Sequence, residues 1–291
     1  MSHAPVNDVG SLAVVAITLL LLFYSGMLFE PAVVRRQLEP AGLRDLSRLA
    51  AANYVLVPLA TLGIIWWFEF SPILNLVLMT MAMLPCAALV PPLVSLVGEA
   101  PQRSLFAFFA LSVLNIAATP ILVALLAIPW VSGDSLSPNG GAVMAVIKYV
   151  IAVFTPMGLG VAFRIGAPRH CATWQPRLRK ALPLLMALVA VLFVYSYREQ
   201  LRALGWRDLE ALVLFEAACI AIGWGLSIGA PQQRVATILI CALRNTAMGL
   251  AFALVVYPHT AAPTYMLVFV SLSFLGAVVG VRLHGATARP A

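Results

Sequence analysis

Arg244 and Asn245 stand in the middle of an apolar stretch that is long enough to cross a lipid bilayer. The stretch from Arg234 to Tyr257 reads RVATILICALRNTAMGLAFALVVY, and Thr246 directly follows the pair. A guanidinium at the centre of a membrane helix costs about 2.5–3.5 kcal/mol on insertion scales. An arginine kept at that cost either binds a solute or only ties two helices together, and this stretch alone leaves both interpretations open.

Two further charged side chains are predicted inside membrane spans. Glu216 lies in the apolar stretch ALVLFEAACIAIGW, one helix before Arg244. Consecutive antiparallel helices can pack side by side, so the sequence predicts an ion pair between Glu216 and Arg244. That pair would be either fixed or opened by an anion that binds the arginine. Lys148 is close to a helix end, from which its side chain can extend to the membrane interface.

A second span is predicted to be interrupted by proline. The stretch 74–97 reads LNLVLMTMAMLPCAALVPPLVSLV and carries Pro85, Pro91 and Pro92. A single proline often only kinks a membrane helix, but each one removes a backbone donor and clashes with the preceding turn. Three prolines within eight residues should therefore break the helix. Two interrupted helices that run in opposite directions are typical of the substrate site of a secondary transporter with inverted repeats.

The remaining polar residues in the predicted spans suggest hydrogen bonding rather than catalysis. Ser112 and Asn115, three residues apart, share one helix face, and interhelical hydrogen bonds would explain either of them. The sequence contains no phosphate-binding loop, zinc-protease motif, catalytic triad or carboxylate dyad, and its four histidines are in loops or near the ends. We therefore expect no enzyme activity, no cofactor and no metal site.

The composition indicates an all-α polytopic membrane protein. Of the 291 residues, 62% are hydrophobic and 10% charged, and the mean hydropathy is +0.98. The apolar runs are continuous and about 20 residues long, whereas transmembrane barrel strands alternate apolar and polar residues over about ten positions. The expected partner is the lipid bilayer. The net charge of +7 comes from basic residues in short loops, where they set topology, so we expect no nucleic-acid partner.

The basic residues also predict the orientation of the chain. Nine apolar runs lie near residues 11–29, 47–67, 74–97, 104–128, 143–163, 181–197, 209–228, 235–257 and 264–281. With the N-terminus outside, 13 of the 18 Lys and Arg are cytoplasmic, three (Arg198, Arg202 and Arg207) are outside and two lie within spans. The opposite orientation reverses this bias. We expect a multi-pass inner-membrane protein with a cytoplasmic C-terminus.

A loop rich in glycine, serine and proline divides the chain into two predicted repeats. Residues 130–142 read WVSGDSLSPNGGA and should form a linker outside the membrane. The first repeat, residues 1–129, would have four spans with the broken helix at 74–97. The second, residues 143–291, would have five spans with the interrupted helix at 235–257. The first repeat therefore lacks one helix relative to the second.

Several short motifs resemble the bile acid:sodium symporter family, in particular a prokaryotic branch of it. They are GMLFEPAVVRR, NYVLVPLA, LPCAALVPPLVSLVGEAPQRS, ATPILVALL and ALRNTAMGLAFALVV, and their order and spacing agree with the family over nearly the whole chain. The resemblance implies two inverted repeats, a core and a panel domain, and two broken helices that cross at the substrate site. It also implies that some members have nine spans. By position, Pro85 to Pro91 matches the first crossover and Arg244 with Asn245 the second.

The sequence departs from the sodium-coupled members of that family at both crossovers. Those members resemble one another in a Pro-Gly-Gly segment that ends in Ser-Asn, and in an acidic residue four positions before a Gln-Asn pair. Here the first crossover reads PCAALVP, Ile240 stands where the acid would be, and Arg244 replaces the glutamine. This changes the local charge by about two units, which is hostile to sodium. We expect a proton-coupled, exchange or facilitative mechanism instead, with Arg244 or its half-helix N-terminus attracting an anion.

The leading hypothesis is a secondary transporter that moves a small organic anion by alternating access. Glu216 and Arg244 would form a coupling or ion pair. The predicted substrate-binding residues lie at the two crossovers and on one neighbouring helix, and they are Pro85, Cys86, Pro91, Pro92, Ser112, Asn115, Arg244, Asn245 and Thr246. One alternative is an arsenite or metalloid exporter, because related arsenite exporters share a Pro-Cys at the first crossover and thiolates suit soft ligands. Another is a receptor or scaffold on a transporter fold.

Overall fold

The computed structural model describes residues 9–122, 141–196, 198–202, 204–228 and 231–246, together with 249, 253, 260–270, 272–273 and 276. All regular secondary structure in these residues is helical, as the composition predicts. The principal helices are α1 (Val9–Met27), α2 (Pro31–Gln37), α3 (Pro40–Ala51), α4 (Val57–Phe68), α5 (Pro72–Ala82), α6 (Val90–Leu96), α7 (Gln102–Leu122), α8 (Gly141–Gly166), α9 (Pro168–Ser196), α10 (Arg198–Arg202), α11 (Trp206–Leu226) and α12 (Arg234–Ala242).

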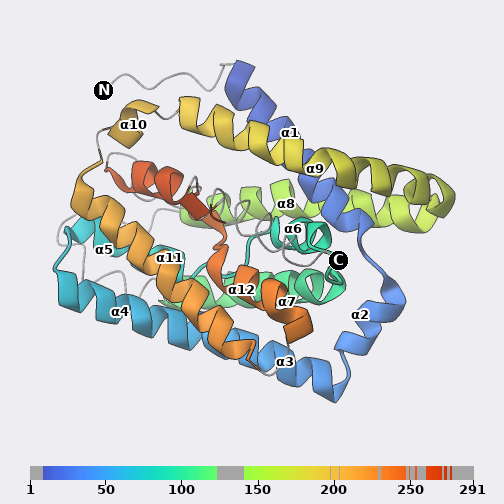
Figure 1. The fold of residues 1–291 in the computed structure, drawn as a ribbon, viewed down its shortest axis with the longest axis horizontal. Helices are drawn as coiled ribbons and strands as arrows, with labels where there is room; N and C mark the ends of the chain where they lie inside the picture. The colour runs from blue at the N-terminus through green and yellow to red at the C-terminus, as the bar shows by residue number, and fades with distance from the viewer. Residues whose placement is uncertain are drawn as a thin grey trace, which may run out of the picture.

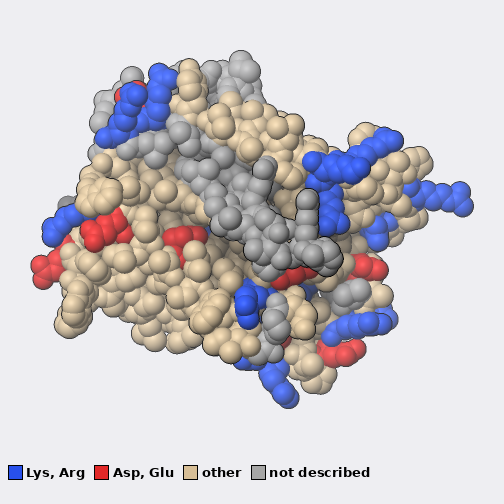
Figure 2. All heavy atoms as spheres, viewed as in Figure 1, with Lys and Arg blue, Asp and Glu red and all other residues tan. Residues whose placement is uncertain are grey.

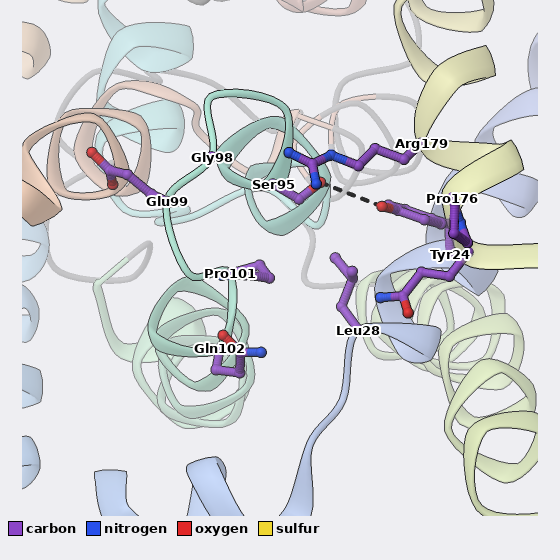
Figure 3. Close-up of a pocket in the computed structure, with 10 residues that line it drawn as sticks. Tyr24, Leu28, Ser95, Gly98, Glu99, Pro101, Gln102, Pro176 and Arg179 are labelled. Atoms are coloured by element: carbon purple, nitrogen blue, oxygen red, sulfur yellow. Dashed lines mark hydrogen bonds between the residues drawn. The ribbon is translucent and has the colours of Figure 1, made fainter. Parts of the chain in front are cut away.

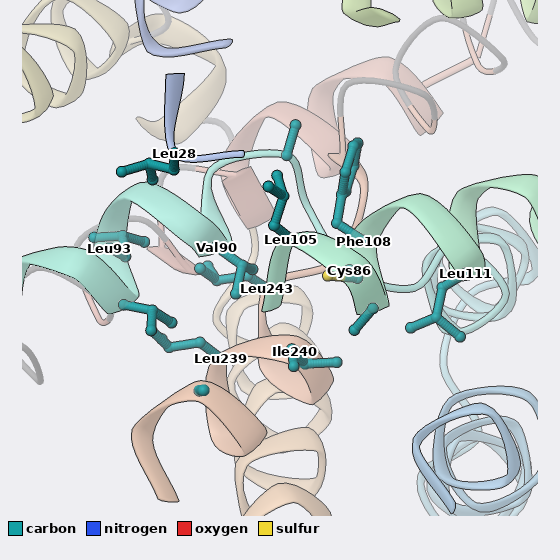
Figure 4. Packing of buried hydrophobic residues seen from close by; sticks show 14 of the residues in the cluster. Leu28, Cys86, Val90, Leu93, Leu105, Phe108, Leu111, Leu239, Ile240 and Leu243 are labelled. Carbon is teal, nitrogen blue, oxygen red and sulfur yellow. The ribbon is translucent and has the colours of Figure 1, made fainter. Parts of the chain in front are cut away.

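The helices form two groups that pack against each other (Figure 1). Helices α1, α8 and α9 contact one another and form what we call the α1 group. Helices α3 to α7, α11 and α12 form the α12 group. One buried apolar cluster joins α1, α8 and α9 to α6, α7 and α12, and Figure 4 shows its centre around Cys86, Val90 and Leu243. A second cluster joins α4, α5 and α11 to residues 262–269 within the α12 group.

Two glycines allow α1 and α8 to approach each other closely. A Cβ atom added at Gly26 would lie 2.0 Å from the carbonyl oxygen of Met157, and one added at Gly160 would lie 2.1 Å from that of Phe23. Small residues at a helix contact let the backbones meet directly, which is how membrane helices commonly associate. The α1 group is therefore held together by backbone contact at this point.

The prolines of the span at 74–97 break it as predicted. Helix α5 ends at Ala82, the chain is irregular until Leu89, and α6 begins at Val90. Pro91 and Pro92 fall in the first turn of α6, where the missing N–H would have no helical partner in any case. In the irregular segment, Cys86 adopts a left-handed conformation with φ of +52°.

The span at 47–67 is part of a longer helical stretch, Pro40–Phe68, that contains one π-helical turn. The turn covers Ala52–Leu56 and ends just before Pro58. Proline cannot donate the helical hydrogen bond and its ring clashes with the preceding turn, so a widened turn before it relieves the conflict. The consequence is a local rotation that places Asn53 in the interior, with no exposed surface.

The basic segment between the fifth and sixth predicted spans is helical, which corrects our expectation of a loop. Helix α8 continues to Gly166 and α9 already begins at Pro168, well before the apolar run that starts at residue 181. Only Ala167 separates the two helices. The apolar pattern therefore located only the apolar second part of α9, because the polar first part of the helix carries the basic residues.

Basic side chains gather at the end of the molecule that carries α2, α3 and the α8–α9 corner, which we call the basic end (Figure 2). By length and composition, two helical stretches of the described residues can cross a membrane, Pro40–Phe68 and Trp206–Leu226. The nine-span inverted-repeat arrangement stays a prediction. Most of the predicted linker 130–142, both chain ends and most of the chain beyond Thr246 lie outside the described residues, as does the side chain of Lys148.

Candidate functional site

The two interrupted helices cross at their unwound segments. The backbone N–H of Ala87 donates to the carbonyl of Leu243 over 2.8 Å, and the N–H of Asn245 donates to the carbonyl of Leu84 over 2.8 Å. The residue numbers rise on one segment as they fall on the other, so the two segments pair in antiparallel fashion. Pro85 and Cys86 lie between the paired positions, which places these two predicted site residues directly at the crossing with Asn245.

The guanidinium of Arg244 is enclosed beside this crossing, where the side chain is 1% exposed. Its Nε donates to the carbonyl of Met81 over 2.9 Å, and its Nη2 donates to the carbonyl of Ala82. Its Nη1 donates to Oδ1 of Asn53 and to the carbonyl of Cys241 over 3.2 Å. An anion could therefore bind this side chain only if some of these four contacts opened.

Asn53 owes its position to the π-helical turn before Pro58. Its Nδ2 donates to the carbonyl of Leu49 over 2.9 Å and approaches the sulfur of Cys241 at 3.8 Å, while its Oδ1 accepts from Arg244. In the sequence, Asn53 is the first residue of the motif NYVLVPLA, and an interhelical hydrogen bond would be enough to explain a polar residue there. The signal that points to its role is the proline five residues later, since π turns often accompany functional sites.

The predicted ion pair between Glu216 and Arg244 is not formed, which corrects that expectation. The Oγ of Ser273 donates to Oε2 of Glu216 over 3.0 Å. Within 4.0 Å, the ion pairs among the described residues are those of Arg103 with Asp45 and of Glu199 with its neighbours Arg198 and Arg202. The physical reason is that the C-terminal carbonyls of α5 and α12 already surround the guanidinium with acceptors.

The other predicted site residues lie on the elements that flank the crossing. Pro91 and Pro92 are buried in α6, and Thr246 donates its N–H to the carbonyl of Arg244 over 2.7 Å. Ser112 and Asn115 are both buried on α7, as their spacing on one helix face predicted. The Oγ of Ser112 is enclosed and has no hydrogen-bond partner among the described residues.

The cysteines of the predicted spans are all free and buried. Cys86, Cys219 and Cys241 have no exposed surface. The described residues contain no cluster of three or more Cys, His, Asp or Glu side chains placed to hold a metal ion. A three-thiolate site made of these cysteines is therefore not assembled in this conformation.

A cavity of about 330 Å³ opens near the basic end, between the α1 group and the α12 group (Figure 3). Its polar lining comes from five elements: Tyr24 on α1, Ser95 on α6, Glu99 in the loop between α6 and α7, Gln102 at the start of α7, and Gln175 and Arg179 on α9. The hydroxyl groups of Tyr24 and Ser95 lie 3.4 Å apart and connect the two groups across the cavity. This cavity could not be predicted from the sequence, because its lining residues are far apart in the chain.

One carboxylate of the cavity lining, Glu99, also fixes the start of α12. Glu99 accepts the backbone N–H groups of Val235 and Ala236 over 3.0 and 2.9 Å. These groups belong to the first turn of α12, which has no helical partners for them and carries a partial positive charge. Glu99 therefore joins the loop after one interrupted helix to the beginning of the other. Glu99 belongs to the motif LPCAALVPPLVSLVGEAPQRS, although the sequence alone did not reveal the contact.

A second connection runs from α3 through α7 to α12. Arg103 binds Asp45 with two hydrogen bonds, from Nε over 2.6 Å and from Nη2 over 2.8 Å. Its Nη1 donates to Oγ1 of Thr237 over 2.9 Å. The sequence placed Arg103 among the topology-setting loop residues, whereas its side chain is only 10% exposed in this bidentate ion pair.

One comparison with known proteins identifies the family of the chain. The comparison with curated proteins finds no match to the chain. The sequence profile of the sodium bile acid symporter family matches residues 46–202, which include the first crossover and the cavity residues of α6, α7 and α9. Such a match together with the apolar helices indicates an integral membrane protein of a transporter family. Since the match covers more than half of its 291 residues, the chain belongs to the sodium bile acid symporter family.

Proposed function

We propose that the protein is a secondary transporter that moves a small organic anion across the inner membrane by alternating access. The observation that carries this proposal is the cavity between the two helix groups. Its volume of about 330 Å³ is at the lower end of the range for small-molecule sites. Positive charge from Arg179 and hydrogen-bonding groups from Tyr24, Ser95, Gln102 and Gln175 suit a carboxylate or a similar anionic group. Glu99 also lines the cavity, but its two oxygens already accept backbone N–H groups at the positive start of α12.

The position of the cavity supports an alternating-access mechanism. It opens near the basic end, which the positive-inside rule assigns to the cytoplasm. Its walls come from different helix groups, and the hydrogen bond between Tyr24 and Ser95 is long at 3.4 Å. Rocking of the α1 group against the α12 group would break this contact and change the access to the cavity. The α1 group would then act as the panel and the α12 group as the core.

The proposed transport does not use the usual sodium sites. Ile240 is fully buried where sodium-coupled relatives would have an acidic residue, and the guanidinium of Arg244 is close to the crossing. A fixed positive charge next to an apolar side chain opposes the binding of a free cation. Glu216 offers a carboxylate without an ion-pair partner among the described residues, so a proton is our preferred coupling ion.

The role of Arg179 can be tested with the matched variants Arg179→Gln and Arg177→Gln. Arg179 lines the cavity, whereas Arg177 lies over the ring of Trp174, with its Cζ 5.9 Å from the ring centroid. We expect Arg179→Gln to weaken binding of the best-bound small carboxylate by about 10-fold to 100-fold, the value of a hydrogen bond to a charged group. Thermal unfolding in detergent across a panel of mono- and dicarboxylates measures the effect. Equal affinity in both variants contradicts the assignment.

Two other functions are separated by direct measurements. A receptor or scaffold on this fold predicts no flux of any bound anion into proteoliposomes, whereas a transporter predicts saturable flux. An arsenite exporter predicts that Cys86→Ala eliminates metalloid efflux. We favour the organic-anion transporter, because the cavity carries Arg179 and several hydrogen-bonding groups, whereas the described residues contain no cluster of three thiols placed to hold a metalloid.

A further inference from the structure

The crossing brings the C-terminal ends of two half-helices together. Helix α5 ends at Ala82 and helix α12 ends at Ala242, on the two segments that pair through the hydrogen bonds of Ala87 and Asn245. The last carbonyls of a helix lack helical partners and carry the equivalent of about −0.5 elementary charge. Two such ends amount to about one negative charge in the interior of the protein, and a single cation would balance it.

The guanidinium of Arg244 is positioned to be that cation. It donates to the carbonyls of Met81 and Ala82 in the last turn of α5, and to the carbonyl of Cys241 in the last turn of α12. The side-chain oxygen of Asn53 is a fourth acceptor. In discontinuous membrane helices, unwound carbonyls and half-helix C-terminal ends are the groups that coordinate a coupling cation. Here a covalently attached cation takes these acceptors.

We infer that Arg244 is a built-in counter-ion, which holds the two half-helix ends together in place of a free metal cation. The counter-ion role concerns the folded state and does not depend on the proposed transport function. Only its consequence for ion coupling rests on that function. The consequence is that this position cannot couple transport to an ion gradient, because a side chain cannot dissociate from the protein. The crossing should also keep its stability whatever cation is in solution.

The sodium response of the unaltered protein gives the first test. We expect the same thermal unfolding midpoint in detergent with sodium chloride, potassium chloride and choline chloride at equal ionic strength, because the acceptors at the crossing are already occupied. A saturable increase that is specific to sodium would show a free-cation site and overturn the inference. This measurement needs no variant and no transported substrate, so it remains valid if the organic-anion proposal fails.

The variant Arg244→Ala gives the second test, with guanidinium chloride at low millimolar concentration as the probe. We expect its midpoint to fall by at least about 5 °C, and the free guanidinium ion to restore part of that loss in a saturable way. The unaltered protein should show no such gain, because its own side chain fills the site. An unchanged midpoint in Arg244→Ala, or an equal response of both proteins to guanidinium, overturns the inference. If Arg244→Ala yields no folded protein, the comparison of sodium, potassium and choline chloride on the unaltered protein still tests the inference.

Discussion

Gly160→Ala is expected to destabilise the folded protein by about 3 kcal/mol, the upper part of the range for overpacking. The added Cβ would lie 2.1 Å from the carbonyl oxygen of Phe23 and 3.0 Å from the Cα of Gly26. Both are backbone atoms of α1, so a side-chain rotation cannot remove the clash. The two helices must therefore move apart, and contacts along the whole α1–α8 interface are lost. Thermal unfolding in detergent should show a midpoint lowered by roughly 6–12 °C.

Gly158→Ala is the matched control for this experiment. Gly158 lies on the same helix, two residues earlier, and an added Cβ there meets no atom within 4 Å. Alanine is the better helix former, so this variant should unfold at the same temperature as the unaltered protein or slightly higher. If both variants behave alike, close contact between α1 and α8 does not contribute to stability.

Asp45→Ala is expected to cost about 3 kcal/mol, because it leaves the guanidinium of Arg103 without its carboxylate. The Arg103 side chain is 10% exposed and that of Asp45 33% exposed, so water compensates for only part of the loss. For this reason we expect a loss of stability at the lower end of the range that is typical when one partner of a buried ion pair is removed. The midpoint of thermal unfolding should fall by roughly 6–12 °C.

Two further variants make this prediction specific to the ion pair. Glu39→Ala removes an exposed carboxylate from the residue before α3, whose side chain makes no capping hydrogen bond, and it should have little effect. The double variant Asp45→Ala/Arg103→Met removes both charges and should recover part of the lost stability. A double variant that is no more stable than Asp45→Ala would contradict an uncompensated buried charge as the cause.

The interruption of both crossing helices could be predicted from particular residues. Three prolines can only break or kink a helix, and an arginine inside a membrane span needs acceptors, so the sequence fixes where each break occurs. The acceptors could not be predicted in the same way. Arg244 is surrounded mainly by the backbone carbonyls of Met81, Ala82 and Cys241. Every residue has a carbonyl, so the sequence points instead to the nearest opposite charge, Glu216.

Contacts between distant parts of the chain could not be predicted from the sequence either. The helical face on which Asn53 lies depends on a π turn that rotates the helix by a fraction of a turn, and a regular period of 3.6 residues does not describe it. The cavity depends on the relative placement of α1, α6 and α9. Glu99 and Arg103 looked like loop residues, because their partners on α12 are more than one hundred positions away in the chain.

The antiparallel pairing at the crossing bears on how such a protein can diversify. Ala87 and Asn245 are joined to the opposite segment through their main-chain N–H groups, and Leu84 and Leu243 through their carbonyls. Main-chain groups are present after almost any substitution, so mutations can replace the side chains around the crossing without removing these backbone hydrogen bonds. Descendants of one ancestral protein could therefore acquire different substrates or coupling ions while they keep the same backbone pairing between the two crossing segments.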